Sequence, residues 1–516
     1  MNQETVIILG IPIDNLTLDS ALETIFSMID AYAQDSRPRL IATVNVDFVV
    51  NTLKWRLKSI RHPELLDILR RADLVTADGM PIVWTSKLLG APLQERVTGA
   101  DMVPALGREA AERGKSLFLL GGKGDVGQRA ADVLTKRNPG LEIAGVYAPF
   151  VHVEGEALDF TEQEDREIVE RINRSGADIL LIGFGNPKQE IWFERNRNRL
   201  NVPVSIGIGG TYEFIVGTVT RAPRWMQKTG TEWIFRITQD PKRLWKRYFV
   251  GFFKFGLMIF PAVLYYRYKN LMYKLTHRKP VAENGADMSV TANPYITVIK
   301  LPKRLDAAYV SKAAAFIEKA TRENTMPVLD FHQCAFIDSS GLGYIVKLWH
   351  KMAEKNAKLF FTGVMHASVV RCFKLSRVYD IFKDLIFENT ADVLNHIKLK
   401  RPLPSFYYTM TSEDKFVIMT LFGRLDAAQM LKLDVATIIR QIGRNPLLMH
   451  LKHLNFTDST GLRLFLKLFK HCSGHNKTFM LCEPSDNFAQ MLRITKLNTL
   501  FEIEPNLADA RKMLEK

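Results

Sequence analysis

The stretch 72-ADLVTADGMPIVW-84 decides the fold of the first part of the chain. Its apolar start predicts a short buried strand that breaks at Asp78-Gly79, and an apolar helical run follows from Pro81 to Leu89. Pro81 suits a first helical turn, where its missing N–H costs least. A strand that ends in a carboxylate before a helix places that carboxylate at the mouth of an open α/β sheet, where ligands bind. Asp78 is therefore the first candidate for chemistry, the alternative being a helix N-cap.

Strand-like and helical runs alternate on both sides of this stretch. The predicted strands include Val6–Ile11, Leu40–Val46 and Ser116–Leu120, and the predicted helices include Leu18–Tyr32 and Val126–Arg137. Strands alternating with helices of this length favour a mostly parallel, Rossmann-like sheet covered on both faces. We expect this α/β domain to occupy residues 1–235.

The bulk composition is that of a globular protein of about three domains. The chain has 516 residues, 47% of them apolar, and a net charge of +15. Its four cysteines show no metal-like spacing, which suits a reducing cytoplasm. Acidic residues interrupt the early apolar run, so we expect no signal peptide.

Glycine-rich turns follow two of the predicted strands. Gly122, Gly124 and Gly127 fit G-x-G-x-x-G and predict a loop that cradles a nucleotide phosphate. A dinucleotide enzyme is disfavoured, because the acid at the expected distance opens its strand instead of closing it. The second turn, GFGNPKQE, places Gly185, Gln189 and Glu190 toward a ligand, where the two side chains could bind sugar hydroxyls. For Glu190 the alternative is a first-turn partner of the helix dipole.

Five ordered motifs, TVNVDF, ADLVTADGMP, ERVTGAD, GFGNPKQE and GIGGTYEFIVGTVTRAPRW, resemble the WecG/TagA/CpsF family of glycosyltransferases. The resemblance implies inverting transfer of an N-acetylmannosamine-type sugar, or its uronic acid, from a UDP-sugar to a polyprenyl-diphosphate-linked sugar. It implies that Asp78 is the general base and that Thr43, Asn45, Arg96 and Gln189 bind substrate. Glu213 stands where the family more usually has aspartate. No D-x-D metal motif occurs in this domain, so we expect no metal or other cofactor and cationic side chains against the diphosphate.

Residues 236–280 form a basic, apolar segment. Between Pro241 and Lys279 lie ten basic residues and no acidic one. The run RITQDPKRLWKRY resembles the family's C-terminal appendage, which implies diphosphate contacts for Arg236, Arg243, Lys246 and Arg247; the alternative is a solvated basic face. Tyr248–Tyr266 is nearly long enough to span a bilayer, but Lys254 and Pro261 stand against a simple span. We expect an interfacial or re-entrant membrane anchor, and no nucleic-acid binding.

The tail is an internal repeat. RLDAA occurs at Arg304 and again at Arg424, and DSSGL at Asp338 answers DSTGL at Asp458, both pairs 120 residues apart. The copies, expected at 295–400 and 405–516 after a linker at 281–294, resemble STAS domains, the fold of anti-sigma-factor antagonists. The resemblance implies phosphorylation at Ser339 and Ser459; the alternative is that Asp and Ser only cap a helix.

Together these features predict a glycosyltransferase at the cytoplasmic face of the inner membrane, peripheral or monotopic, that serves cell-surface polysaccharide synthesis. The STAS tandem is expected to regulate it through a partner protein or kinase, and removal of the tail after about residue 277 is expected to leave the chemistry intact. A homo-oligomer is left open. The alternative function is a non-catalytic nucleotide-sugar-binding scaffold that recruits partners.

Overall fold

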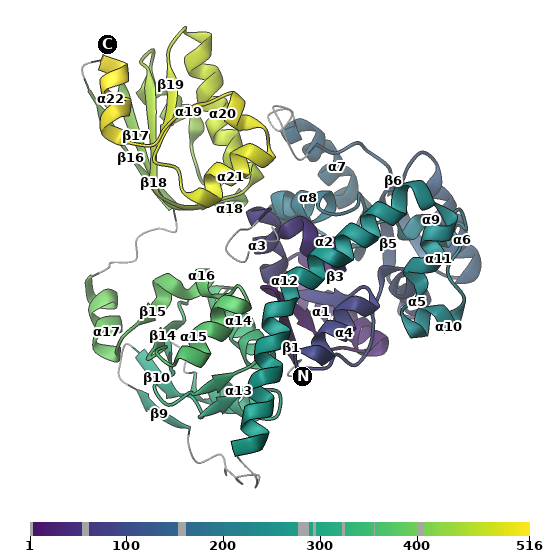
Figure 1. Ribbon diagram of the computed structural model, residues 1–516. Helices are drawn as coiled ribbons and strands as arrows, with labels where there is room; N and C mark the ends of the chain where they lie inside the picture. The colour runs from purple at the N-terminus through teal and green to yellow at the C-terminus, as the bar shows by residue number, and fades with distance from the viewer. Residues whose placement is uncertain are drawn as a thin grey trace.

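The computed structural model describes residues 4–53, 61–152, 161–276, 288–292, 296–321, 326–354, 357–399, 406–413 and 415–515. It confirms the α/β class. An N-terminal domain, here residues 4–239, is joined by one long helix to two small α/β domains, called the first repeat (288–399) and the second repeat (406–515) (Figure 1).

The N-terminal domain is built on six strands that all run parallel, in the order β4-β3-β8-β7-β5-β6. Side chains alternate between two buried faces: Leu117 and Leu119 face one core, and Phe118 and Leu120 face the other. Strands buried on both sides read as continuous apolar runs, as these do. The strands are β3 (Arg39–Val44), β4 (Leu74–Ala77), β5 (Ser116–Gly121), β6 (Glu142–Tyr147), β7 (Ile179–Gly183) and β8 (Val204–Gly207).

Helices cover both faces of this sheet. One face packs on α1 (Leu18–Asp35), α5 (Gly99–Glu112), α6 (Val126–Arg137) and α9 (Thr211–Ile215). The other packs on α3 (Pro63–Arg71), α7 (Thr161–Ser175) and α8 (Lys188–Asn196). The helices α2 (Val46–Thr52) and α4 (Met80–Leu88) follow β3 and β4 directly.

The apolar run Val6–Ile11 is not the single strand that the sequence predicts. It forms β1 (Thr5–Ile8) and the start of β2 (Ile11–Asp14), an antiparallel hairpin outside the six-stranded sheet. The two turn residues Leu9 and Gly10 have φ angles of 52° and 89°, as a two-residue hairpin turn requires. The hairpin is tied to the sheet because Asp14 accepts a hydrogen bond from the backbone N–H of Val75 in β4, 2.9 Å.

The basic apolar segment forms a helical appendage. α10 (Arg224–Thr229) and α11 (Glu232–Gln239) lead into α12 (Pro241–Thr276), a 36-residue helix that continues through Pro261. α12 crosses the N-terminal domain and reaches the first repeat (Figure 1). Its stretch Tyr248–Lys269 is long and apolar enough to cross a membrane by length and composition, with a third of the window buried inside the molecule.

The two repeats share one topology. Each has a five-stranded sheet, in the orders β15-β14-β12-β10-β9 and β16-β17-β18-β19-β20, with one antiparallel edge pair and otherwise parallel pairs. The edge strand β9 lies inside the stretch 281–294 that the composition predicts to be a linker.

The elements of the first repeat are β9 (Ser289–Ala292), β10 (Ile296–Lys300), β11 (Arg304–Leu305), α13 (Val310–Ala320), β12 (Met326–Asp330), β13 (Phe336–Ile337), α14 (Ser339–Glu354), β14 (Phe360–Thr362), α15 (Ala367–Leu375), α16 (Tyr379–Phe382), β15 (Ile386–Phe387) and α17 (Thr390–Leu399). Those of the second are β16 (Phe406–Ser412), β17 (Val417–Leu425), α18 (Ala427–Met430), α19 (Val435–Ile442), β18 (Leu447–Thr457), α20 (Ser459–Gly474), β19 (Phe479–Cys482), α21 (Asp486–Ile494), β20 (Glu502–Glu504) and α22 (Leu507–Glu515).

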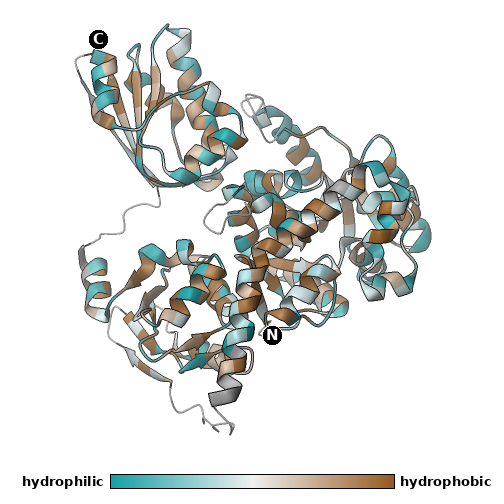
Figure 2. Ribbon diagram, viewed as in Figure 1, coloured by the Kyte–Doolittle hydropathy of each residue, from teal (hydrophilic) through white to brown (hydrophobic). Residues whose placement is uncertain are grey.

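The first repeat shares its larger hydrophobic core with the N-terminal domain, whereas a small cluster of Ile296, Val328, Phe360 and Val393 is its own. One continuous cluster joins the β1–β2 hairpin, α2, α4 and α12 to the buried side chains of the first repeat. The second repeat has separate clusters, which contain only its own residues. Figure 2 shows apolar residues gathered in the strands of each domain and along α12.

Candidate active site

A cavity of about 750 Å³ opens at the carboxyl edge of the N-terminal sheet. Its floor consists of residues that follow β3, β4, β7 and β8, which are neighbours in the sheet. The opposite wall comes from α11 and the first turns of α12, where Trp233, Tyr248 and Phe252 contact one another. The cavity therefore lies where open α/β sheets bind their ligands.

Asp78 faces this cavity from the end of β4. Its backbone N–H donates to the carbonyl of Val44 in β3, 2.8 Å, which fixes the turn. The N-cap residue of α4 is Gly79, with φ 140°, and no side chain makes a capping hydrogen bond to this helix. Asp78 therefore does not act as the helix cap. Burial raises the pKa of Asp78 to about 6, against the opposing charges of Arg236 and Arg96. A carboxylate with a pKa near neutrality is suited to proton transfer.

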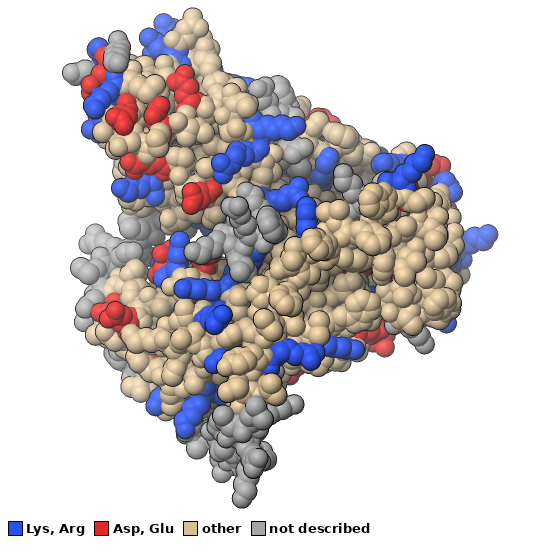
Figure 3. Space-filling view, viewed as in Figure 1, with Lys and Arg blue, Asp and Glu red and all other residues tan. Residues whose placement is uncertain are grey.

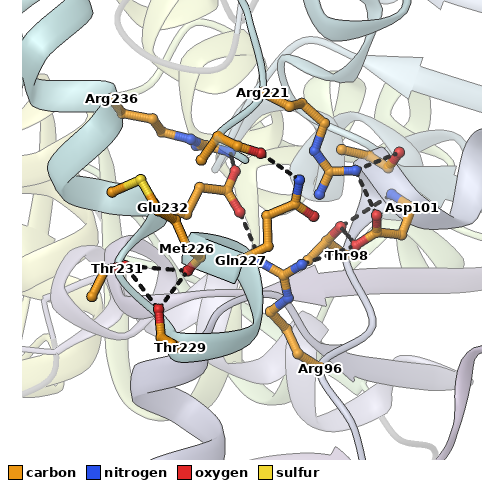
Figure 4. A network of polar contacts seen from close by, with 12 residues as sticks. Arg96, Thr98, Asp101, Arg221, Met226, Gln227, Thr229, Thr231, Glu232 and Arg236 are labelled. Atoms are coloured by element: carbon orange, nitrogen blue, oxygen red, sulfur yellow. Dashed lines mark hydrogen bonds and ion pairs between the residues drawn. The ribbon is translucent and has the colours of Figure 1, made fainter. Parts of the chain in front are cut away.

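Two carboxylates hold three arginines together (Figure 4), and these arginines line the same cavity as Asp78. Glu232 accepts hydrogen bonds from Arg96, 2.8 Å, and from Arg236, 3.0 Å. Asp101 accepts from Arg96, 3.2 Å, and from Arg221, 2.5 Å. Burial opposes ionisation of Glu232, but the neighbouring arginines lower its pKa overall. The cluster joins the appendage, which carries Arg236 and Glu232, to the sheet domain, which carries Arg96.

Arg96 and Arg236 are among the site residues predicted from the sequence, whereas Asp101, Arg221 and Glu232 are not. Arg221 lies inside the quoted motif GTVTRAPRW, so the motif could have singled it out. For Glu232 the only signal is its spacing of four residues from Arg236 on α11.

Three of the predicted substrate-binding residues line the cavity with side-chain atoms that already have partners. The Thr43 hydroxyl donates to the carbonyl of Gly207, 2.9 Å, and Asn45 caps α2 by accepting from Asp47 N–H, 3.0 Å. The Gln189 side-chain oxygen accepts from the N–H groups of Gly185, 3.2 Å, and Gly209, 3.0 Å. Gln189 therefore braces the two glycine turns that follow β7 and β8, and Glu213 lines the cavity from the first turn of α9.

Two predicted site residues do not reach the cavity. Glu190 is buried beneath it and accepts hydrogen bonds from Gln189, 2.6 Å, and Asn186, 3.4 Å, while burial raises its pKa to about 7. Gly122 is absent from the cavity lining, because its loop folds back against Gly127 and Tyr212. The glycine-rich loop after β5 thus stands apart from the cavity, at a strand farther along the sheet.

The remaining predicted residues fall in two groups, the basic residues of α12 and the two phosphorylation candidates. Arg243, Lys246 and Arg247 lie in α12, but their side chains are outside the described residues. Ser339 and Ser459 begin α14 and α20 and are completely buried, and the backbone N–H of Ser459 donates to Glu64 in α3, 3.0 Å. Within the described part of the chain, no group of three or more His, Cys, Asp or Glu residues could hold a metal ion.

The chain is similar to known proteins in two separate regions. The model of the glycosyl transferase WecG/TagA/CpsF family matches residues 6–269, just over half of the chain, and the STAS domain model matches residues 287–393 and 407–510. The N-acetylglucosaminyldiphosphoundecaprenol N-acetyl-beta-D-mannosaminyltransferase of Staphylococcus aureus (strain MRSA252) is 31% identical over 244 residues, which are 47% of this chain and 88% of that protein. The protein of the same name from Bacillus spizizenii is 28% identical over 238 residues, 46% of this chain and 85% of that protein. Among solved structures, an anti-sigma factor antagonist from Mycobacterium paratuberculosis aligns with a TM-score of 0.20 at 19% identity, over 22% of this chain and 98% of that one.

Proposed function

Because this chain belongs to the WecG/TagA/CpsF family of glycosyl transferases, we propose that it transfers an N-acetylmannosamine-type sugar from a UDP-sugar to a polyprenyl-diphosphate-linked sugar. The observation that carries the proposal is Asp78, a carboxylate with a pKa of about 6 in a cavity that three arginines also line. The acceptor is supported by the relatives, which are named N-acetylglucosaminyldiphosphoundecaprenol mannosaminyltransferases and so act on a sugar linked to undecaprenol by a diphosphate.

The chemistry is an inverting displacement at the anomeric carbon of the donor. Asp78 takes the proton of the acceptor hydroxyl while that oxygen forms the new bond, and the bond to the nucleoside diphosphate breaks on the opposite face. Negative charge develops on the departing diphosphate, and Arg96, Arg221 and Arg236 offset it. Guanidinium groups suit this task because they bind phosphate oxygens in pairs.

The enzyme works at a membrane surface, with α12 as its contact. A stripe of exposed apolar residues follows α12 over several turns, with Phe253 and Phe260 exposed by 69% and 62%. The stripe consists of Trp245, Phe249, Phe253, Leu257, Phe260, Leu264, Tyr268 and Leu271. Figure 3 shows the uncharged surface along this helix with lysine and arginine side chains at its borders. Apolar residues with flanking cations are the features of a helix that lies in the membrane interface.

The other side of α12 argues for lying on the membrane, not spanning it. Phe255, Met258, Ile259 and Ala262 are buried in the core that α12 shares with α2, α4 and the first repeat. Insertion across a bilayer would strip that side from its protein contacts. Such a peripheral position is on the cytoplasmic face, where the nucleotide sugar is available.

The test is an assay of purified protein with a panel of UDP-sugars and a short-chain lipid diphosphate acceptor. Asp78→Asn keeps the shape of the side chain and removes the base, so turnover should fall by roughly 10²- to 10⁴-fold, while calorimetric binding of the UDP-sugar changes little. Asp125→Asn is the matched control, because the Asp125 side chain is exposed, makes no capping hydrogen bond to α6 and lies outside the cavity. Near wild-type turnover of Asp78→Asn would refute the assignment, and no transfer with any donor would favour the scaffold alternative.

A further inference from the structure

Each repeat contacts the N-terminal domain through the helix that occupies the equivalent position in the two repeats. α14 of the first repeat and α20 of the second begin with the DS[ST]G turns that lie 120 residues apart. Each helix packs against the N-terminal domain: α14 on the β1–β2 hairpin and α20 on α8. The helix that follows the DS[ST]G turn is therefore covered, in both repeats, by the N-terminal domain of the same chain.

The first repeat makes this contact with apolar surface. Gly343 in α14 lies so close to β1 that an added Cβ would stand 2.1 Å from the carbonyl oxygen of Thr5. Around it, Val6 and Ile8 of β1 belong to the same continuous core as Leu342 and Val346 of α14. Separation of this contact would open a hydrophobic core to water.

The second repeat makes the equivalent contact with charge. Arg463 occupies the repeat position of Gly343, and its guanidinium donates to Thr161, 2.7 Å, and to Asp165, 3.2 Å, in α7. Arg424 pairs with Asp67 of α3, 2.6 Å. The Ser459 N–H, at the start of α20, donates to the carboxylate of Glu64 in α3, 3.0 Å.

The carboxylate of Glu64 occupies the space in front of the α20 N-terminus. It is buried there near Asp458, and burial raises the pKa of both groups. Asp426 and Glu194 add further negative charge nearby, and Arg195 adds positive charge. One more negative charge on Ser459 would meet an already acidic surface.

We infer that the second STAS domain is a detachable module that docks on the acidic surface of α3 and α7, whereas the first STAS domain is a permanent part of the catalytic unit. Release uncovers a basic face, Arg424, Arg463 and Lys467, together with a free helix N-terminus, which fits an acidic partner. The inference concerns attachment and stands whether or not the proposed sugar transfer is correct.

The test uses the full-length chain with Arg463→Glu and, separately, Ser459→Asp. Arg463→Glu removes one partner of the buried pair with Asp165, which is strongly destabilising, and Ser459→Asp adds a negative charge next to Glu64. Amide hydrogen exchange in α3, α7 and α20 should therefore rise at least roughly tenfold in each variant. The radius of gyration from X-ray scattering should increase. Exchange in α14 and the β1–β2 hairpin should stay at the wild-type level, as should exchange in β17 and β18. Arg440→Glu is the matched control, since Arg440 is exposed on the same domain and bonds only to Thr437.

Unchanged exchange and scattering in both variants would overturn the inference. So would loss of protection in α14 together with α20, because the two repeats would then separate as one unit. Loss of protection in β17 and β18 would also overturn it, because the second repeat would not be an independent module.

Discussion

Asp78 and its neighbours make the pH dependence of the reaction predictable. The base must be ionised to accept a proton, and its pKa is raised to about 6. We therefore expect kcat/KM to fall as pH drops through about 6 and to level off above it. Arg236 lowers this pKa by its charge, so Arg236→Gln should move the midpoint to higher pH, whereas Arg440→Gln should leave it in place. Full pH–rate profiles measure this, and an unmoved midpoint in Arg236→Gln would show that another group limits the rate.

The residues also show how far a sequence can be read. Asp78, Arg96 and Arg236 could be selected because they lie in motifs or at the end of an apolar run. Gln189 lines the cavity, and its side-chain oxygen accepts hydrogen bonds from the backbone N–H groups of Gly185 and Gly209. No local sequence pattern reveals the bond to Gly209. Glu232 went unnoticed because a glutamate on a helix is ordinary until the fold places an arginine opposite it.

Among the elements, α12 makes the sharpest prediction. Phe253 and Phe260 are exposed in the protein, and we expect membrane binding to bury both side chains in the lipid interface. Burial of one phenylalanine side chain contributes roughly 1.5 kcal/mol or more. The double variant Phe253→Ser with Phe260→Ser should therefore bind anionic vesicles about 100-fold more weakly. Leu431→Ser is the control, because Leu431 is similarly exposed, 61%, but lies in the second repeat. Vesicle sedimentation measures the binding. If the wild-type protein resists extraction by alkaline carbonate, the helix spans the membrane instead.

A helix or strand could be predicted where its own sequence determines its structure. The prediction was wrong where contacts with distant parts of the chain determine the structure. Val126–Arg137 is helical over the predicted range, because its apolar spacing and flanking turns agree. Val6–Ile11 reads as one buried strand because every residue is apolar. It is a hairpin turn in fact, and its two sides are buried by β4 and by α14, a helix more than 300 residues away.

Across the whole molecule, the shared core reverses the expectation for truncation. A chain that ends after Leu399 keeps the first repeat and its core, so it should fold with a melting temperature close to that of the same unit in the full chain. A chain that ends after Thr276 exposes Val6, Ile8 and the part of α12 that packs on α15, including Tyr265 and Tyr266, so it should aggregate or melt far lower. Calorimetry of the two fragments decides this, and equal stability would mean that the first repeat is dispensable.

The β1–β2 hairpin also has a consequence for the order in which the protein folds during synthesis. It leaves the ribosome near the start of translation, but the helix that covers it, α14, begins about 325 residues later. At 5–20 residues per second the gap lasts on the order of half a minute. During that time an apolar ribbon with Val6, Ile7 and Ile8 on it has no permanent cover. We therefore expect the nascent chain to bind chaperones early in synthesis, and its N-terminal domain to reach full stability only once the first repeat has emerged.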